Sequence, residues 1–117
     1  MPLDNVEPWI GVDLDGTLAD TRTAPIPQYM IPSPIPAMVE RVKKWVERGY
    51  TVKVFTARMS SSPELWQLRI GNWTEQFIGT RLEATCCKDY GCIAIWDDIA
   101  IGVYPNTGIS RTTRPDE

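Results

Sequence analysis

The feature that most constrains this chain is a short apolar stretch, Trp9 to Val12, that runs directly into an acidic turn, Asp13 to Leu18. A short apolar run bounded by a turn is typical of a buried strand, and Gly16 supplies the sharp turn. Alternation along the extended chain points Asp13 and Asp15 to the same side. Two carboxylates so close repel each other unless a cation or a shared proton relieves them. The pattern therefore predicts a buried strand that is followed directly by the carboxylates of a reactive site.

The same residues could begin a calcium loop or form a solvated turn. Counted from Asp13, an EF-hand needs glycine at the sixth position and glutamate at the twelfth, where this chain has Leu18 and Ala24. The EF-hand is therefore excluded. A solvated turn would need no apolar strand before it, so we favour a reactive site.

Length and charge narrow the class of protein. The chain has 117 residues and a formal net charge of -3, which fits one soluble domain. An acidic balance disfavours a protein that grips a nucleic-acid backbone. We see no leader peptide and no membrane-spanning run, and expect a cytoplasmic protein. The chain has no histidine, so Cys86, Cys87 and Cys92 are expected to be small core residues rather than zinc ligands.

Periodicity predicts an alternation of helices and strands. Helices are expected over 37–48 and from Ser61 or Ser62 to about Gly79, and strands over 51–56, 93–96 and 99–104. A helix between two strands gives a parallel unit whose carboxyl ends share one edge. Residues 20–36 contain five prolines, and we interpret them as a flap over the Asp13 site rather than an interdomain linker. Residues 111–117 are expected to be a frayed tail.

Four parts of the sequence resemble, in order, the motifs of the haloacid dehalogenase (HAD) superfamily of phosphotransferases. The turn Asp13–Leu18 resembles the first motif, and Val54–Thr56 resembles the second. Lys88 resembles the lysine of the third motif, and Trp96–Asp98 resembles the fourth. The resemblance spans Trp9 to Gly108 and is closest to small, capless phosphatase-like members.

The resemblance implies a single HAD-like domain over 1–117, with an α/β, Rossmann-like three-layer sandwich, a small, mainly parallel sheet and no large cap. One spacing departs from the family. Only Lys88 to Cys92 separate Cys87 from Ile93, whereas a parallel crossover through a helix needs about a dozen residues. Either Ala84 to Cys87 is no full strand of the sheet, or the chain reaches the fourth strand from an edge. We therefore expect a reduced sheet of four or five strands.

The resemblance also implies roles for the site residues. Asp13 would be the nucleophile that forms an aspartyl-phosphate, and Asp15 the general acid and base. Mg2+ would be held by Asp13, the backbone carbonyl of Asp15 and Asp98, with Asp97 acting through water or a hydrogen bond. The phosphorylated substrate would be held by Thr56, Ala57 and Lys88. Arg58, just past Thr56, is expected either to contact a distal anion of the substrate or to be a solvated arginine on the side of a helix.

These roles predict a Mg2+-dependent phosphohydrolase, a phosphomonoesterase whose substrate the sequence does not name. We expect a small phosphorylated molecule, no membrane partner, and leave a homo-oligomer open. Two alternatives remain: a phosphatase for nucleotides or nucleic-acid ends, and a non-catalytic phosphate-binding module on the same fold.

Overall fold

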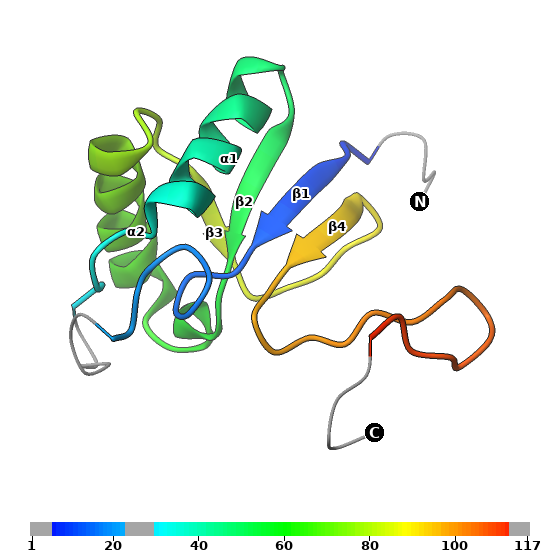
Figure 1. The fold of residues 1–117 in the computed structure, drawn as a ribbon. Helices are drawn as coiled ribbons and strands as arrows, with labels where there is room; N and C mark the ends of the chain where they lie inside the picture. The colour runs from blue at the N-terminus through cyan, green and yellow to red at the C-terminus, as the bar shows by residue number, and fades with distance from the viewer. Residues whose placement is uncertain (1–5, 23–29, 113–117) are drawn as a thin grey trace.

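Figure 1 shows the computed structural model, which describes residues 6–22 and 30–112. The described chain forms a four-stranded, all-parallel sheet with strand order β3-β2-β1-β4 and two α-helices. In chain order the elements are β1 (Trp9–Val12), α1 (Pro36–Glu47), β2 (Thr51–Phe55), the short 3-10 helix η2 (Ala57–Ser60), α2 (Pro63–Phe77), β3 (Glu83–Thr85) and β4 (Cys92–Trp96). The predicted α/β class with a small parallel sheet is confirmed. Residues 23–29 of the predicted flap and 113–117 of the predicted tail lie outside the described residues.

Both helices pack on one face of the sheet. The steps from β1 to β2 and from β2 to β3 run in the same direction, and right-handed crossovers then put both connections on the same side. Alternate strand residues such as Val12, Val54 and Ala84 are buried against Val42 of α1 and Ile70 of α2 in one apolar cluster. This packing fixes the sheet against the helices and thereby the positions of the strand ends.

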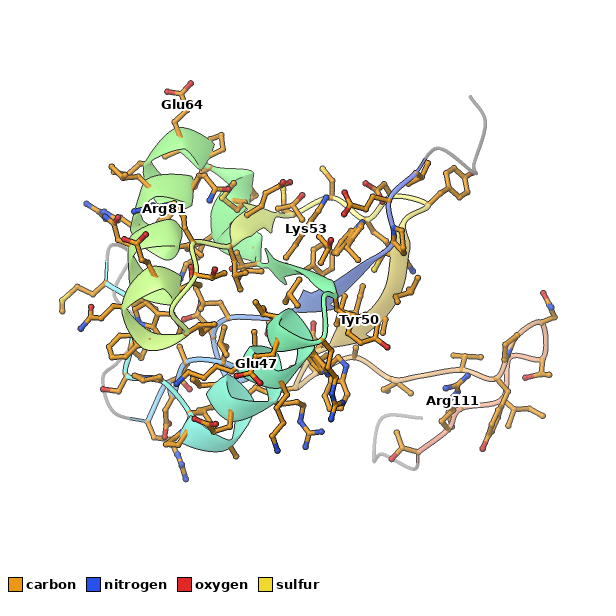
Figure 2. All side chains as sticks on the ribbon, turned by 90° about the horizontal axis from the view of Figure 1, so that it is seen from above. Glu47, Tyr50, Lys53, Glu64, Arg81 and Arg111 are labelled. Carbon is orange, nitrogen blue, oxygen red and sulfur yellow. The ribbon has the colours of Figure 1, made fainter. Side chains whose placement is uncertain are left out.

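The opposite face is crossed by a short connection, residues 86–91, that links β3 at one edge of the sheet to β4 at the other. Figure 2, seen from above, shows this yellow segment and the teal helix α1 on opposite sides of the sheet. Trp9 lies on the same face as the connection, and its indole Nε1 donates a 2.8 Å hydrogen bond to Asp89. That bond and one from the Gly91 N–H lower the pKa of Asp89. The few residues after Lys88 are thus enough because the connection is an extended segment without a helix. We call residues 86–91 the strap.

The predicted strand over 99–104 is wrong. In the described chain, residues after β4 form only an isolated bridge between Val103 and Ser110, with a 2.9 Å hydrogen bond from the Tyr104 N–H to the carbonyl of Ile109. The segment therefore folds back on itself through a turn instead of joining the sheet. Figures 1 and 2 show it projecting away from the sheet, with Arg111 at a distance from the helices.

The expectation of core cysteines is also wrong. Cys86 and Cys87 are exposed, and Cys92 is only partly buried; all three are free thiols. Cys86 and Cys87 lie on the connection between β3 and β4, and Cys92 is the first residue of the edge strand β4. No helix among the described residues is long and apolar enough to cross a membrane.

Candidate active site

The predicted site residues follow the carboxyl ends of three neighbouring strands. Asp13 follows β1, Thr56 follows β2, and Asp97 and Asp98 follow β4. Val12 is in register with Val54 on one side and with Trp96 on the other, so these strands end at the same level. Figure 1 shows the arrowheads of β1, β2 and β4 directed to one edge of the sheet. Parallel pairing therefore brings residues far apart in the sequence to a single place.

Three carboxylates meet at this edge. Asp13, Asp97 and Asp98 each offer an oxygen, and the three oxygens lie within 4.8 Å of one another. Burial, a hydrogen bond with Asp98 and the charge of Asp97 raise the pKa of Asp13 to about 7. The cluster thus gathers two partly buried carboxylates, Asp13 and Asp97, and the exposed carboxylate of Asp98, and a bound cation would relieve the repulsion between them.

The turn after β1 is shaped around Asp98. Gly16 has φ +88°, and a Cβ at this position would collide with the Asp98 carboxylate. The hydroxyl of Thr17 donates a 3.3 Å hydrogen bond to Asp98 Oδ1. Leu14 is fully buried, and its carbonyl accepts from the backbone N–H of Leu18 at 2.9 Å. The turn is therefore stabilised by its own backbone hydrogen bond, is anchored in the core by Leu14, and contacts Asp98, which follows β4.

Asp15 is not one of the three clustered carboxylates. Its Oδ2 accepts a 2.8 Å hydrogen bond from Arg58 Nε, and its Oδ1 accepts a 2.9 Å bond from Arg58 Nη2. The two predicted site residues are thus brought together with each other, on the η2 side of the edge. The sequence predicted Asp15 at the reacting group and Arg58 either at a distal substrate anion or in solvent, and it did not predict this pair.

A cavity of about 300 Å³ opens beside Asp13. Its lining includes the predicted residues Asp13, Thr56, Ala57 and Asp97, together with Phe55, Cys86 and Ile99. Thr56 is buried, and its hydroxyl oxygen accepts a 3.2 Å hydrogen bond from the backbone N–H of Arg58. The three additional residues sit at or just beyond strand ends, which is the one sequence signal that could have found them.

Lys88 lies on the strap and is exposed. It lines a neighbouring cavity of about 350 Å³ that Asp97 also lines, whereas the cavity beside Asp13 does not include it. In the structure Lys88 therefore shares a cavity with Asp97 but does not line the cavity beside Asp13.

Comparison with protein-family models, with curated proteins and with solved structures gives no match to this chain. The chemistry of the site therefore rests on its residues and their geometry.

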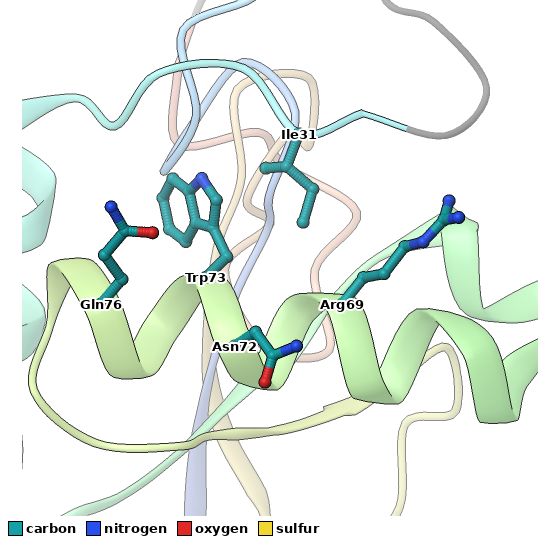
Figure 3. A pocket seen from close by; sticks show the side chains of 5 residues that line it. All are labelled: Ile31, Arg69, Asn72, Trp73 and Gln76. Atoms are coloured by element: carbon teal, nitrogen blue, oxygen red, sulfur yellow. The ribbon is translucent and has the colours of Figure 1, made fainter.

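A third cavity, of about 390 Å³, lies between residue Ile31 and helix α2. Figure 3 shows Arg69, Asn72, Trp73 and Gln76 of α2 facing it. The indole Nε1 of Trp73 donates a 3.2 Å hydrogen bond to the carbonyl of Pro32, which holds this segment on the helix. The cavity shares no lining residue with the one beside Asp13.

Proposed function

We propose that this protein is a Mg2+-dependent phosphohydrolase, a phosphomonoesterase that acts through an aspartyl-phosphate on Asp13. The observation that carries the proposal is the meeting of Asp13, Asp97 and Asp98 within 4.8 Å, beside a cavity that Thr56 also lines. Phosphoryl transfer needs little more than a positioned nucleophile and positive charge around the phosphoryl oxygens.

The donor set fits Mg2+. Carboxylate oxygens are the ligands that this hard cation prefers, and it keeps waters in its remaining positions. Asp13 and Asp98 would hold the ion directly, with Asp97 and the backbone carbonyl of Asp15 beside it. A bound Mg2+ would withdraw charge from the phosphoryl oxygens and favour the ionised form of Asp13.

In the proposed reaction Asp13 is the nucleophile and Asp15 transfers the protons. A carboxylate oxygen of Asp13 attacks phosphorus while the bond from phosphorus to the leaving oxygen breaks, and Asp15 gives that oxygen a proton. Water then attacks the phosphorus of the aspartyl-phosphate and gives its proton to Asp15. Phosphate leaves, and both carboxyl groups return to their starting state.

Thr56, Ala57 and Lys88 complete the proposed site. Thr56 and Ala57 line the cavity in which the phosphoryl group would lie, and the Thr56 hydroxyl would donate a hydrogen bond to it. Lys88 would add positive charge from the neighbouring cavity, which it lines together with Asp97. We propose a small phosphorylated molecule as substrate, because the cavity beside Asp13 is only about 300 Å³.

Two broader parts of the proposal concern architecture and location. We propose that the domain belongs to the Rossmann-like, three-layer class, although the described helices occupy one face of the sheet.

We also propose that it works in the cytoplasm, where its three free thiols would stay reduced.

The test is a panel of phosphomonoesters, including sugar phosphates, nucleotides and 3′-phosphorylated oligonucleotides, assayed for phosphate release with Mg2+ and with chelator. We expect release from at least one small ester in Mg2+ and none in chelator. Release from oligonucleotides alone would favour a nucleic-acid-end phosphatase. Phosphate binding without turnover would favour a non-catalytic module.

A further inference from the structure

Arg58 is held more firmly than a surface arginine. Its side chain is 9% exposed and that of its partner Asp15 is 21% exposed. Two parallel hydrogen bonds, of 2.8 and 2.9 Å, join the guanidinium to both carboxylate oxygens. Such two-bond pairs fix the orientation of the carboxylate as well as its position.

An aromatic ring holds the guanidinium from a second direction. The Cζ of Arg58 lies 4.6 Å from the centroid of Trp66, a buried residue of the first turn of α2. Arg69, one turn further along α2, places its own Cζ 5.3 Å from the same centroid. A planar cation that rests on an aromatic ring and pairs with a carboxylate has little freedom left.

Asp15, the partner of Arg58, is the general acid and base of the proposed reaction. Asp15 stands two residues after Asp13, in the turn that also contacts Asp98 through Gly16 and Thr17. A general acid or base acts only when its oxygen is within hydrogen-bond reach of the proton that it transfers, and a misplacement of about 1 Å can cost a hundredfold in rate. A group that fixes the position of the Asp15 carboxylate, as Arg58 does, therefore affects the rate of every step in which Asp15 transfers a proton.

We propose that Arg58, stacked on Trp66, is a positioning residue that orients Asp15 for proton transfer, and that it is not a contact for a distal substrate anion. This inference rests on the proposed phosphohydrolase function. The Nε and Nη2 atoms of Arg58 each donate a hydrogen bond to Asp15, and its guanidinium also lies on the Trp66 ring, so we infer that it acts on the substrate through that carboxylate.

The two halves of the reaction should respond differently to loss of Arg58. An aryl phosphate with an activated leaving group needs no proton to form the aspartyl-phosphate, whereas hydrolysis of that intermediate needs Asp15 as base. Loss of the clamp should therefore slow the second half more than the first. The aspartyl-phosphate would then accumulate, and the first turnover would be visible as a burst of product.

The experiment compares Arg58→Gln with wild type on p-nitrophenyl phosphate in Mg2+, by rapid mixing and at steady state. We expect kcat to fall about a hundredfold, KM to fall with it because hydrolysis of the aspartyl-phosphate becomes rate-limiting, and a burst of about one product per enzyme. In an Asp15→Asn background, Arg58→Gln should lower kcat no further, because its effect passes through Asp15.

Two more variants separate positioning from folding. Arg58→Lys keeps the charge but not the two-bond geometry, so it should restore the melting temperature more than it restores kcat. Arg69→Gln removes the other cation on the same Trp66 ring and should show no burst.

Three results would overturn the positioning role: wild-type kcat in Arg58→Gln, a rise in KM with kcat unchanged, or an equal further loss in the Asp15→Asn background. A wild-type protein with no turnover on any ester would instead overturn the proposed function, and the positioning role with it.

Discussion

The backbone N–H of Asp13 donates a 2.8 Å hydrogen bond to the carbonyl oxygen of Trp96. This bond extends the pairing of β1 with β4 by one residue beyond the strands, so the chain leaves both at the same level. Asp97, the next residue after Trp96, is thereby placed beside Asp13. The carboxylate cluster is a consequence of strand register.

Asp13→Asn should abolish turnover and raise the stability of the metal-free protein. The amide keeps the shape of the side chain but removes the attacking charge, so we expect kcat to fall at least about a thousandfold. It also removes repulsion from Asp97 and Asp98, so the melting temperature in chelator at pH 8 should rise. Phosphate-release assays and thermal melts measure the two effects. Wild-type turnover by this variant would contradict the nucleophile assignment.

The metal-free protein should lose stability as pH rises toward and through neutrality. The pKa of Asp13 is raised from 3.8 to about 7 in the folded state, so folding favours the protonated form. The stability that this group contributes is full below pH 3.8 and is lost as pH rises to about 7. Chemical unfolding in chelator at several pH values should show this loss, and Asp13→Asn should lack it. A wild-type loss equal to that of the variant would contradict the shift.

Gly16→Ala should weaken metal binding beyond its cost in stability. Gly16 and Gly49 both have φ +88°, but a Cβ at Gly16 meets the Asp98 carboxylate, whereas one at Gly49 meets nothing within 4 Å. Both alanine variants should lose about 1 kcal/mol or more of stability from backbone strain. Only Gly16→Ala should also lose part of the rise in melting temperature produced by Mg2+. Equal Mg2+ responses in the two variants would show that the turn does not shape the site.

Lys88→Met should reduce turnover without changing the fold. Lys88 is exposed on the strap and shares a cavity with Asp97, so its removal costs charge near the phosphoryl group but no packing. We expect kcat to fall about tenfold to a hundredfold, with the melting temperature close to wild type. Lys88→Arg, which keeps the charge, should retain most of the turnover. Wild-type kcat in Lys88→Met would remove this lysine from the site.

The sequence predicted the parts of the site that depend on strand ends. Asp13 and Asp97 follow apolar stretches, and parallel pairing alone brings such ends together. The pair of Asp15 with Arg58 could not be foreseen in the same way, because it depends on how η2 turns after Thr56 and on where α2 places Trp66. The positions of η2 and Trp66 depend on tertiary packing, and a local sequence pattern does not reveal that packing.

The two errors have different physical reasons. The stretch 99–104 has the composition of a strand, but the turn after it offers a nearer hydrogen-bonding partner than the sheet does. The cysteines were assigned by their usual burial, yet the short strap leaves Cys86 and Cys87 without covering side chains. In the first case a local hydrogen-bonding partner decides the outcome, and in the second the lack of covering side chains does.

The most direct test of the central claim is to trap the phosphoryl group on the enzyme. Asp15→Asn should form the aspartyl-phosphate from an activated aryl phosphate but hydrolyse it slowly, so an acid quench in Mg2+ should preserve it. Peptide mapping by mass spectrometry should then find one added phosphoryl group on Asp13, absent in chelator and in the Asp13→Asn/Asp15→Asn double variant. A protein that releases phosphate from the ester while Asp13 stays unmodified in Asp15→Asn, or that carries the label on another residue, would contradict the account.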